Sequence, residues 1–335
     1  MTTAPDAASP AETSRVAVLQ RIPEVGIDRL RDAGFRVDAS EREAPLDPTE
    51  RAAILADARA AVTLLTDRVD DAFLDEAPHL RIVANVAVGF DNIDVAACAA
   101  RGVVVTNTPG VLTDATADLT LALLLAVTRR VGEGERLIRS GASWSWGMFM
   151  MLGRGLRDRQ LGIVGMGAIG TAVAERARAF GMSVAYHNRS AVDAELADRL
   201  GAERVALDEL FATSDVVSLH CPHTPETHHL VDASRLASMR PDAYLVNTAR
   251  GPVVDEAALV AALEAGQIAG AALDVYENEP EVHPGLVDRD DVVLLPHLGS
   301  ATIETRDAMS DLAARNVVAV LTGEQPITPV APPAT

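Results

Sequence analysis

Three side chains suited to proton transfer and anion binding, Arg250, Glu279 and His297, each follow a short β-like run. An imidazole exchanges a proton near neutral pH, so His297 is a candidate general acid or base. Glu279 is the candidate carboxylate that would fix the tautomer of His297 and favour its protonated form. Arg250 could bind a substrate carboxylate with two parallel hydrogen bonds and polarise a neighbouring carbonyl. Taken singly, the arginine could belong to a surface ion pair and the histidine could be structural. Together, at the carboxyl ends of parallel strands, they predict an active site.

A second motif lies in the middle of the chain, where the apolar run of residues 161–170 (LGIVGMGAIG) carries three glycines spaced G-x-G-x-x-G. Gly165 would allow a tight turn, Gly167 would let a pyrophosphate approach the backbone, and Gly170 would let the following helix pack close to the strand. The N–H groups at the start of that helix would face the phosphates. The alternative is a glycine-rich turn without a ligand. The strand before the glycines and the helix after them favour a dinucleotide site.

The strand that follows this helix bears on the choice of cofactor. NAD sites usually place Asp or Glu about 20 residues after the glycines, on the ribose hydroxyls. Here residues 186–190 read YHNRS and contain no acid. Arg189 and Ser190, with Asn188 beside them, could instead bind a 2′-phosphate, which predicts a preference for NADPH with NADH possible. The alternative is that Arg189 only stacks on the adenine.

The elements that must position these residues form a regular series. Short β-like runs alternate with helical patterns from residue 15 to 106 and again from 161 to 295, which implies parallel βαβ units. A long apolar helix is expected at 113–131 and a final helix from Ala301 to about Leu321. Residues 132–157 read as irregular, and the Trp and Met residues gathered at 144–151 favour a subunit contact, with ordinary core as the alternative.

Composition narrows the function. The chain has 335 residues, which suggests two domains, and a formal net charge of −19, which argues against nucleic acid and anionic membranes as partners. It contains no lysine, which excludes Schiff-base, pyridoxal-phosphate and Walker A chemistry. Cys98 and Cys221 have no metal-like spacing, so we expect no metal site and a reducing compartment. No secretory signal or spanning segment is evident, so a cytoplasmic location is expected.

Six segments carry a resemblance to a known family. They are NVAVGFDNID at 85–94, TNTPGVLTDATAD at 106–118, the glycine loop, NTARG at 247–251, LDVYENEP at 273–280 and PHLGSAT at 296–302. In order and spacing they resemble the D-isomer-specific 2-hydroxyacid dehydrogenases, and within them the glyoxylate/hydroxypyruvate reductases. The resemblance covers nearly the whole chain apart from its ends.

The resemblance implies a fold. The expected class is α/β, with two doubly wound parallel-sheet domains: a Rossmann nucleotide-binding domain inserted into a discontinuous flavodoxin-like substrate (catalytic) domain. We expect the substrate domain at 15–106 and 301–325, the NAD(P)-binding domain at 107–300, a disordered tail at 1–14 and a loose tail at 326–335. The final helix would then cross back to the first domain.

The resemblance also implies an activity, the NAD(P)H-dependent reduction of a small 2-oxo acid (glyoxylate or hydroxypyruvate) to the D-2-hydroxy acid by an oxidoreductase. His297 would donate the proton, Glu279 would keep it protonated, and Arg250 would hold the carboxylate, with Leu65 and the backbone at Val88 and Gly89. Family members are usually homodimers. Residues expected to contact the cofactor are Gly165, Gly167, Ala168, Ile169, Gly170, Asn188, Arg189, Ser190, Cys221, Pro222, Thr227, Thr248, Ala249, Asp274, Gly299 and Thr116.

Other functions stay open at this point. A phosphite dehydrogenase would carry a lysine at the position of Val88, and a phosphoglycerate dehydrogenase would usually extend further at its carboxyl end. A corepressor-like protein that binds NAD(H) without catalysis is a third alternative, and any oxidation of NADPH by a 2-oxo acid would argue against it.

Overall fold

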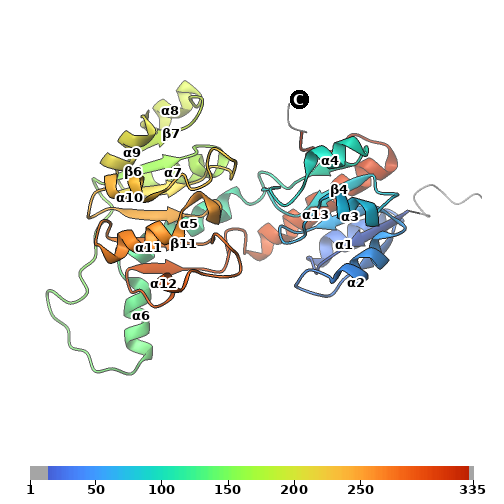
Figure 1. Cartoon of the computed structure of the whole chain (residues 1–335). Helices are drawn as coiled ribbons and strands as arrows, with labels where there is room; N and C mark the ends of the chain where they lie inside the picture. Colours follow the sequence, from blue (N-terminus) through green and yellow to red (C-terminus); the bar gives the residue numbers. More distant parts are fainter. Residues whose placement is uncertain (1–13, 332–335) are drawn as a thin grey trace, which may run out of the picture. The chain divides into compact units, whose positions relative to one another are not determined.

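The computed structural model describes residues 14–331, and the chain divides into two compact units (Figure 1). Unit 1 comprises the residues up to Leu112 together with those from Ser300 onward, and unit 2 comprises Thr113–Gly299. The expected tail at 1–14 lies outside the described residues except for Ser14. The chain therefore leaves unit 1 once and returns to it once.

Unit 1 is built on a five-stranded parallel sheet in the order β2-β1-β3-β4-β5, the flavodoxin-like order. The strands are β1 (Arg15–Val18), β2 (Arg36–Ala39), β3 (Ala58–Thr63), β4 (Ile82–Asn85) and β5 (Val104–Thr106). The helices are α1 (Glu24–Asp32), α2 (Pro48–Leu55), α3 (Asp71–Glu76), α4 (Val95–Ala100) and α13 (Ile303–Thr322). The last helix, α13, packs against α1 and against β3 and β4, so the end of the chain completes this unit.

The residues after α13 differ from the expected loose tail over their described part. Thr328 donates its hydroxyl to the carbonyl of Asn107 at 2.6 Å and accepts a bond from Asn316 Nδ2 at 2.8 Å. The amide of Val330 donates to Val105 in β5 at 2.8 Å. Because the buried Asn316 side chain also accepts from the Thr328 amide, this segment is tied to α13 and β5 rather than free.

Unit 2 is built on a seven-stranded parallel sheet in the order β12-β11-β10-β9-β6-β7-β8. The order reverses between β6 and β9, which makes that point the switch at which open α/β sheets bind ligands. The strands are β6 (Gln160–Val164), β7 (Ser183–His187), β8 (Ala202–Arg204), β9 (Val216–Leu219), β10 (Tyr244–Asn247), β11 (Gly270–Leu273) and β12 (Val292–Leu294). The expected pair of doubly wound parallel sheets, with a Rossmann order in the second, is confirmed.

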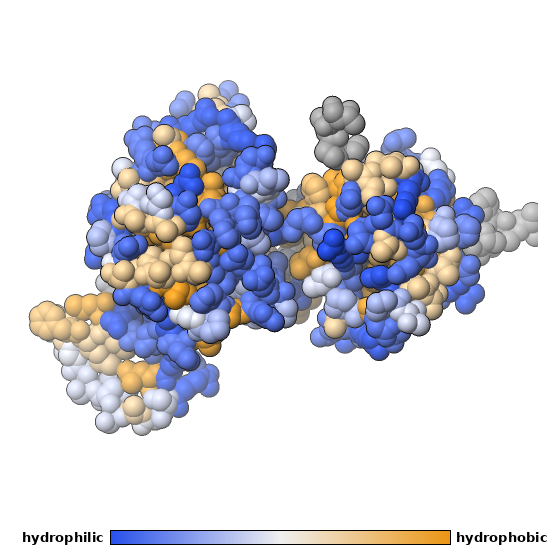
Figure 2. Space-filling view, in the orientation of Figure 1, coloured by the Kyte–Doolittle hydropathy of each residue, from blue (hydrophilic) through white to orange (hydrophobic). Residues whose placement is uncertain are grey.

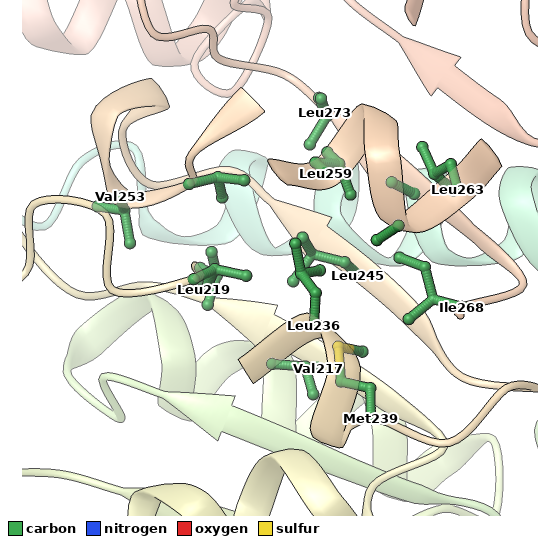
Figure 3. Packing of buried hydrophobic residues seen from close by; sticks show 14 of the residues in the cluster. Val217, Leu219, Leu236, Met239, Leu245, Val253, Leu259, Leu263, Ile268 and Leu273 are labelled. Carbon is green, nitrogen blue, oxygen red and sulfur yellow. The ribbon is translucent and has the colours of Figure 1, made fainter. Parts of the chain in front are cut away.

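Helices cover both faces of the second sheet. One core lies between the sheet and α5 (Thr113–Thr128) with α7 (Ala168–Ala179). The opposite core lies under α9 (Leu207–Thr213), α10 (Ala233–Ser238) and α11 (Glu256–Glu264). Figure 3 shows this second core, where Leu236 and Leu259 meet Val217 and Leu245 of the strands. The strands are apolar on both faces because both faces are buried.

Four elements were not expected. They are β8, the 3-10 helix η1 (Gly251–Val253), the short helix α12 (Pro284–Val287), and α6 (Val131–Arg139), which occupies the first part of the segment expected to be irregular. The expected helix at 113–131 therefore divides into α5 and α6, with Arg130 between them at φ +54°. Two glycines in α6 weaken its helical signal. The remaining helix, α8, spans Ala194–Leu200. Among the described residues, no helix combines the length and apolarity needed to cross a bilayer.

Candidate active site

The glycine loop joins β6 to α7, and its three glycines differ in what surrounds them. Gly165 has φ +94°, and a Cβ there would lie 2.5 Å from the amide nitrogen of Cys221 at the end of β9. A Cβ on Gly170 would lie 2.5 Å from the carbonyl oxygen of Gly165, so this glycine brings α7 close to the loop. A Cβ on Gly167 would meet no atom within 4 Å. Gly165 and Gly170 are thus needed by the fold, whereas Gly167 faces open space in which a ligand can approach the backbone.

A cavity of about 410 Å³ opens beside this loop, a size typical of small-molecule sites. Of the residues expected to bind cofactor, it brings together those from the glycine loop, the end of β7 and the segment after β9. They are Gly165, Gly167, Asn188, Arg189, Ser190, Cys221, Pro222 and Thr227. His220 also lines it, and burial lowers the pKa of this imidazole to about 4, so it is neutral. Ala168 and Ile169 form the first turn of α7, whose amides lack partners within the helix.

The end of β7 is held by side chains that differ in role. Asn188 accepts the amide of Met166 at 2.6 Å and donates to its carbonyl at 3.2 Å, so its side chain fixes the glycine loop. Arg204, at the end of β8, donates to the carbonyls of Asn188 and Arg189 at 3.0 and 2.9 Å. Glu226 also lines the cavity, and a hydrogen bond from Thr224, with a smaller contribution from the Arg189 charge, holds the pKa of its carboxyl below its usual range.

The three candidate catalytic residues follow three neighbouring strands. Arg250 comes after β10, Glu279 after β11 and His297 after β12, and these strands pair in parallel, so their carboxyl ends share one edge of the sheet. Glu279 Oε2 lies 2.8 Å from His297 Nδ1. Because a carboxylate only accepts, Nδ1 carries a proton, and Nε2 is the atom that can exchange one with a substrate.

The electrostatics of Glu279 favour its ionised form. Burial raises the pKa of this carboxyl, but the hydrogen bond to His297 and its charge, the amide of Tyr276 and the charge of Arg250 outweigh burial and leave the pKa below its usual value. The Tyr276 amide donates to Oε1 at 3.0 Å, so both oxygens are engaged. A carboxylate held ionised beside an imidazole favours the protonated imidazole.

Arg250 is half-buried in a loop that its own backbone helps to fix. Asn247 Nδ2 donates to the Arg250 carbonyl at 2.9 Å, and Asn247 Oδ1 accepts the amide of Ala249 at 3.0 Å. Arg250 Nη1 donates to the Ala249 carbonyl at 2.7 Å. The buried amide of Asn247 thus sets the turn that brings the guanidinium charge near Glu279.

Asp274 positions His297. The backbone of His297 has φ +54°, a left-handed conformation that is uncommon outside glycine, and its amide donates to the Asp274 carbonyl at 2.9 Å. The Asp274 carboxylate accepts the amides of Leu298 and Gly299 at 2.7 and 2.8 Å. Its side chain was expected to contact cofactor. Both of its oxygens hold the turn that carries His297, and burial raises the pKa of this carboxyl.

Other expected cofactor residues tie α5 to the strand ends. Thr116 donates its hydroxyl to the Gly299 carbonyl at 3.1 Å, and the Thr248 hydroxyl lies 3.0 Å from that of Thr120. These contacts place the start of α5 against the turns after β10 and β12. Cofactor contacts at Thr116, Thr248, Ala249, Asp274 and Gly299 stay predictions.

The substrate residues expected in unit 1 lie in loops held by asparagines. Asn107 Nδ2 donates to the Val88 carbonyl at 2.7 Å, and Asn85 Nδ2 donates to the Gly89 carbonyl at 2.9 Å. Leu65 is partly exposed in the loop after β3. Substrate contacts at Leu65, Val88 and Gly89 stay predictions.

A second histidine–carboxylate pair lies beside the catalytic loops and was missed. His229 Nε2 lies 2.6 Å from Glu277 Oε1. These residues are 48 positions apart, and neither follows a strand directly. The one sequence feature that could have indicated this pair is the position of Glu277, two residues before Glu279.

The residues present fit a nicotinamide dinucleotide. The open backbone at Gly167, the amides at the start of α7 and the adjoining cavity match the loop, helix and pocket that such a cofactor uses. Within the described part of the chain, no group of three or more His, Cys, Asp or Glu side chains is arranged to hold a metal ion.

Comparison with known proteins identifies the family. Residues 121–299 match the family model of the D-isomer specific 2-hydroxyacid dehydrogenase NAD binding domain. The chain is 46% identical over 321 residues to a glyoxylate reductase of Thermococcus litoralis, covering 93% of this chain and 95% of that one. A glyoxylate reductase of Aeropyrum pernix is 52% identical over 276 residues, covering 81% and 82%.

A solved structure shares the whole architecture. The NADPH-dependent glyoxylate/hydroxypyruvate reductase of Sinorhizobium meliloti, in complex with NADP and malonate, superposes with a TM-score of 0.83 at 37% identity, covering 96% of this chain and 97% of that one. The expected family and enzyme class are confirmed. The chain belongs to the D-isomer-specific 2-hydroxyacid dehydrogenases and is an NAD(P)-dependent enzyme of that family.

Proposed function

We propose that this enzyme reduces glyoxylate or hydroxypyruvate to the corresponding D-2-hydroxy acid and prefers NADPH. The observation that carries the proposal is the 2.8 Å bond between His297 and Glu279, with the Arg250 charge beside it. The names of the relatives support the substrate class, since several of them are glyoxylate reductases.

The bound cofactor would supply hydride transfer, and the chain's own residues would do the rest. Arg250 binds the substrate carboxylate through its planar guanidinium and orients the neighbouring carbonyl. His297 donates the proton on Nε2 to the carbonyl oxygen as the carbonyl carbon is reduced. Glu279 accepts the hydrogen bond from Nδ1 and favours reprotonation of the imidazole.

The glycine loop and α7 would bind the cofactor phosphates. The first-turn amides of α7, at Ala168 and Ile169, supply N–H donors and the positive end of the helix dipole. Gly167 leaves the space for the pyrophosphate. The Asn188 side chain accepts the Met166 amide and so holds the shape of the loop.

The NADPH preference rests on Arg189 and Ser190 in the cavity wall. Residues 186–190 offer no carboxylate to accept bonds from the 2′- and 3′-hydroxyls, and Arg189 supplies a charge that suits a phosphate. The relative from Sinorhizobium meliloti, described as NADPH-dependent, supports the same choice. The test compares kcat/KM for NADPH and NADH in wild type and Arg189→Ala. Equal use of both cofactors by the wild type would refute the preference.

We also propose a homodimer, formed through α6 and the segment 140–152. No residue of α6 is buried, and Trp146 and Phe149 are 76% and 88% exposed. Figure 2 shows apolar side chains gathered at the lower left, where α6 and this segment extend from unit 2. Such a cluster is typical of interface cores, which are rich in Trp, Phe and Met. Light scattering should give twice the chain mass, and monomer at all concentrations would refute the proposal.

The substrate assignment is tested by following NADPH oxidation with a panel of 2-oxo acids. Glyoxylate and hydroxypyruvate should give the highest kcat/KM, with pyruvate and bulkier acids lower. Turnover of none of these acids, with either cofactor, would contradict the proposed function.

A further inference from the structure

The pair formed by His229 and Glu277 connects the loops that carry two of the three candidate catalytic residues. Its side chains are 34% and 24% exposed, and its closest atoms are 2.6 Å apart. The His229 ring also stacks on His228 with centroids 4.1 Å apart, and its Nδ1 lies 3.9 Å from Asp255 Oδ2. The ring is therefore held in one orientation from three sides.

The backbone of His229 contacts the loop of Arg250. Its amide donates to the Pro252 carbonyl at 2.8 Å, two residues beyond Arg250. His229 has φ +50°, which directs its backbone to one loop and its side chain to the other. One residue therefore joins Pro252 to Glu277.

Glu277 in turn is fixed by the first residue of α11. Glu256, which is 5% exposed, accepts the Glu277 amide at 2.8 Å, and the Glu256 amide donates to Glu277 Oε2 at 3.4 Å. The two loops are also in direct contact, because a Cβ on Gly251 would overlap the backbone of Tyr276. The amide of Tyr276 is the one that donates to Glu279.

We propose that His229 and Glu277 are positioning residues that clamp the loop of Arg250 to the loop of Glu279. The clamp acts two positions from each: Pro252 follows Arg250, and Glu277 precedes Glu279. It rests on the proposed function, since it assigns those two residues to substrate binding and to His297. Pro252 lies in a single 3-10 turn (Gly251–Val253) and Glu277 lies in an irregular loop, so the side-chain pair adds to the backbone contacts that set their spacing. A displacement of about 1 Å at a reacting group can cost on the order of a hundredfold in rate.

Four variants test the clamp. His229→Asn keeps a residue that tolerates left-handed backbone but is too short to reach Glu277. Glu277→Ala removes the acceptor, and Glu277→Gln retains an acceptor for the Nε2 proton of His229. Glu281→Ala is the matched control, an exposed carboxylate four positions along the same loop. Each is assayed for kcat and KM with glyoxylate across pH, and for NADPH affinity by fluorescence.

His229→Asn and Glu277→Ala should each lower kcat/KM by about tenfold or more. KM should rise because Arg250 is displaced from the substrate carboxylate. The alkaline limb of the rate profile should move to lower pH because Glu279 is displaced from His297. Their double variant should lose little more than either single, because the two residues act as one unit. Glu277→Gln should recover most of the activity. NADPH affinity and Glu281→Ala should match the wild type.

The clamp is overturned if both single variants stay within about twofold of wild type, or if their loss follows the folded fraction alone with KM and the pH profile unchanged. If the alanine variant does not fold, Glu277→Gln against His229→Asn gives the same comparison. His297→Ala in the same series separates the two proposals. An active His297→Ala contradicts the proton-donor role on which the proposed function rests, whereas an inactive one beside active clamp variants contradicts only the clamp.

Discussion

Replacing Glu279 by glutamine is the sharpest probe of the proposed proton donor. The substitution keeps the size of the side chain and an acceptor for His297 Nδ1, but it removes the negative charge 2.8 Å from that atom. The protonated form of His297 loses its charged partner, whereas the neutral form loses little. In the direction of 2-oxo acid reduction, the alkaline limb of kcat/KM should therefore move to lower pH.

The size of the shift follows from the contact. A hydrogen bond to a charged group contributes about 1.5–3 kcal/mol, and one pH unit corresponds to about 1.4 kcal/mol. Both side chains are 29% exposed, so solvent screens the pair and the lower end applies. We expect the alkaline limb to shift by about one pH unit, with the rate on that limb reduced about tenfold.

The assay is NADPH oxidation with glyoxylate at saturating cofactor, from pH 5 to 9 in buffers of constant ionic strength. Glu281→Gln, on the same loop and exposed, serves as the charge-matched control. If the alkaline limb of Glu279→Gln coincided with that of the wild type and of the control, the role assigned to Glu279 would be refuted.

Three further predictions address binding and stability. Arg250→Ala should lower kcat/KM by about a hundredfold or more, with both KM and kcat affected. Arg250→Lys should recover only part of this activity, since lysine lacks the planar guanidinium fork. If Arg250→Ala changed neither constant, the role of Arg250 in substrate binding would be contradicted. Gly170→Ala should destabilise the fold by about 1–3 kcal/mol, seen as a lower melting temperature, because its Cβ would lie 2.5 Å from the Gly165 carbonyl. Gly167→Ala should leave melting of the cofactor-free protein unchanged but weaken NADPH binding, and equal melting of the two variants would contradict this distinction. The Glu279 carboxyl has a lowered pKa in the folded protein, so its stabilising contribution is present above the unfolded value of about 4.3 and is lost as pH falls through the folded one. The difference in unfolding free energy between wild type and Glu279→Gln should therefore shrink between about pH 5 and pH 3, and a constant difference would contradict it.

The strand-end residues could be predicted because their positions depend on a local rule. In parallel sheets the carboxyl ends of adjacent strands share one edge, so residues just after β10, β11 and β12 converge whatever their separation in the chain. The glycine spacing likewise has one structural reading once a strand and a helix flank it.

Other features depended on contacts between distant segments. His229 reaches Glu277 across 48 positions, and Thr328 reaches Asn107 across 221, and no local pattern marks either pair. The Asp274 carboxylate accepts the amides of Leu298 and Gly299, 24 and 25 positions away, and no local pattern marks that role. α6 was missed because two of its nine residues are glycines, which lower helix propensity.

The most direct test of the proton-donor assignment is the rate of His297→Ala with glyoxylate and NADPH, measured beside NADPH affinity. We predict a fall in kcat on the order of a hundredfold to ten-thousandfold, the range of general acid catalysis, with cofactor affinity unchanged because the dinucleotide cavity is lined by other residues. A His297→Ala enzyme that turns over glyoxylate at close to the wild-type rate would contradict the assignment of His297 as the proton donor.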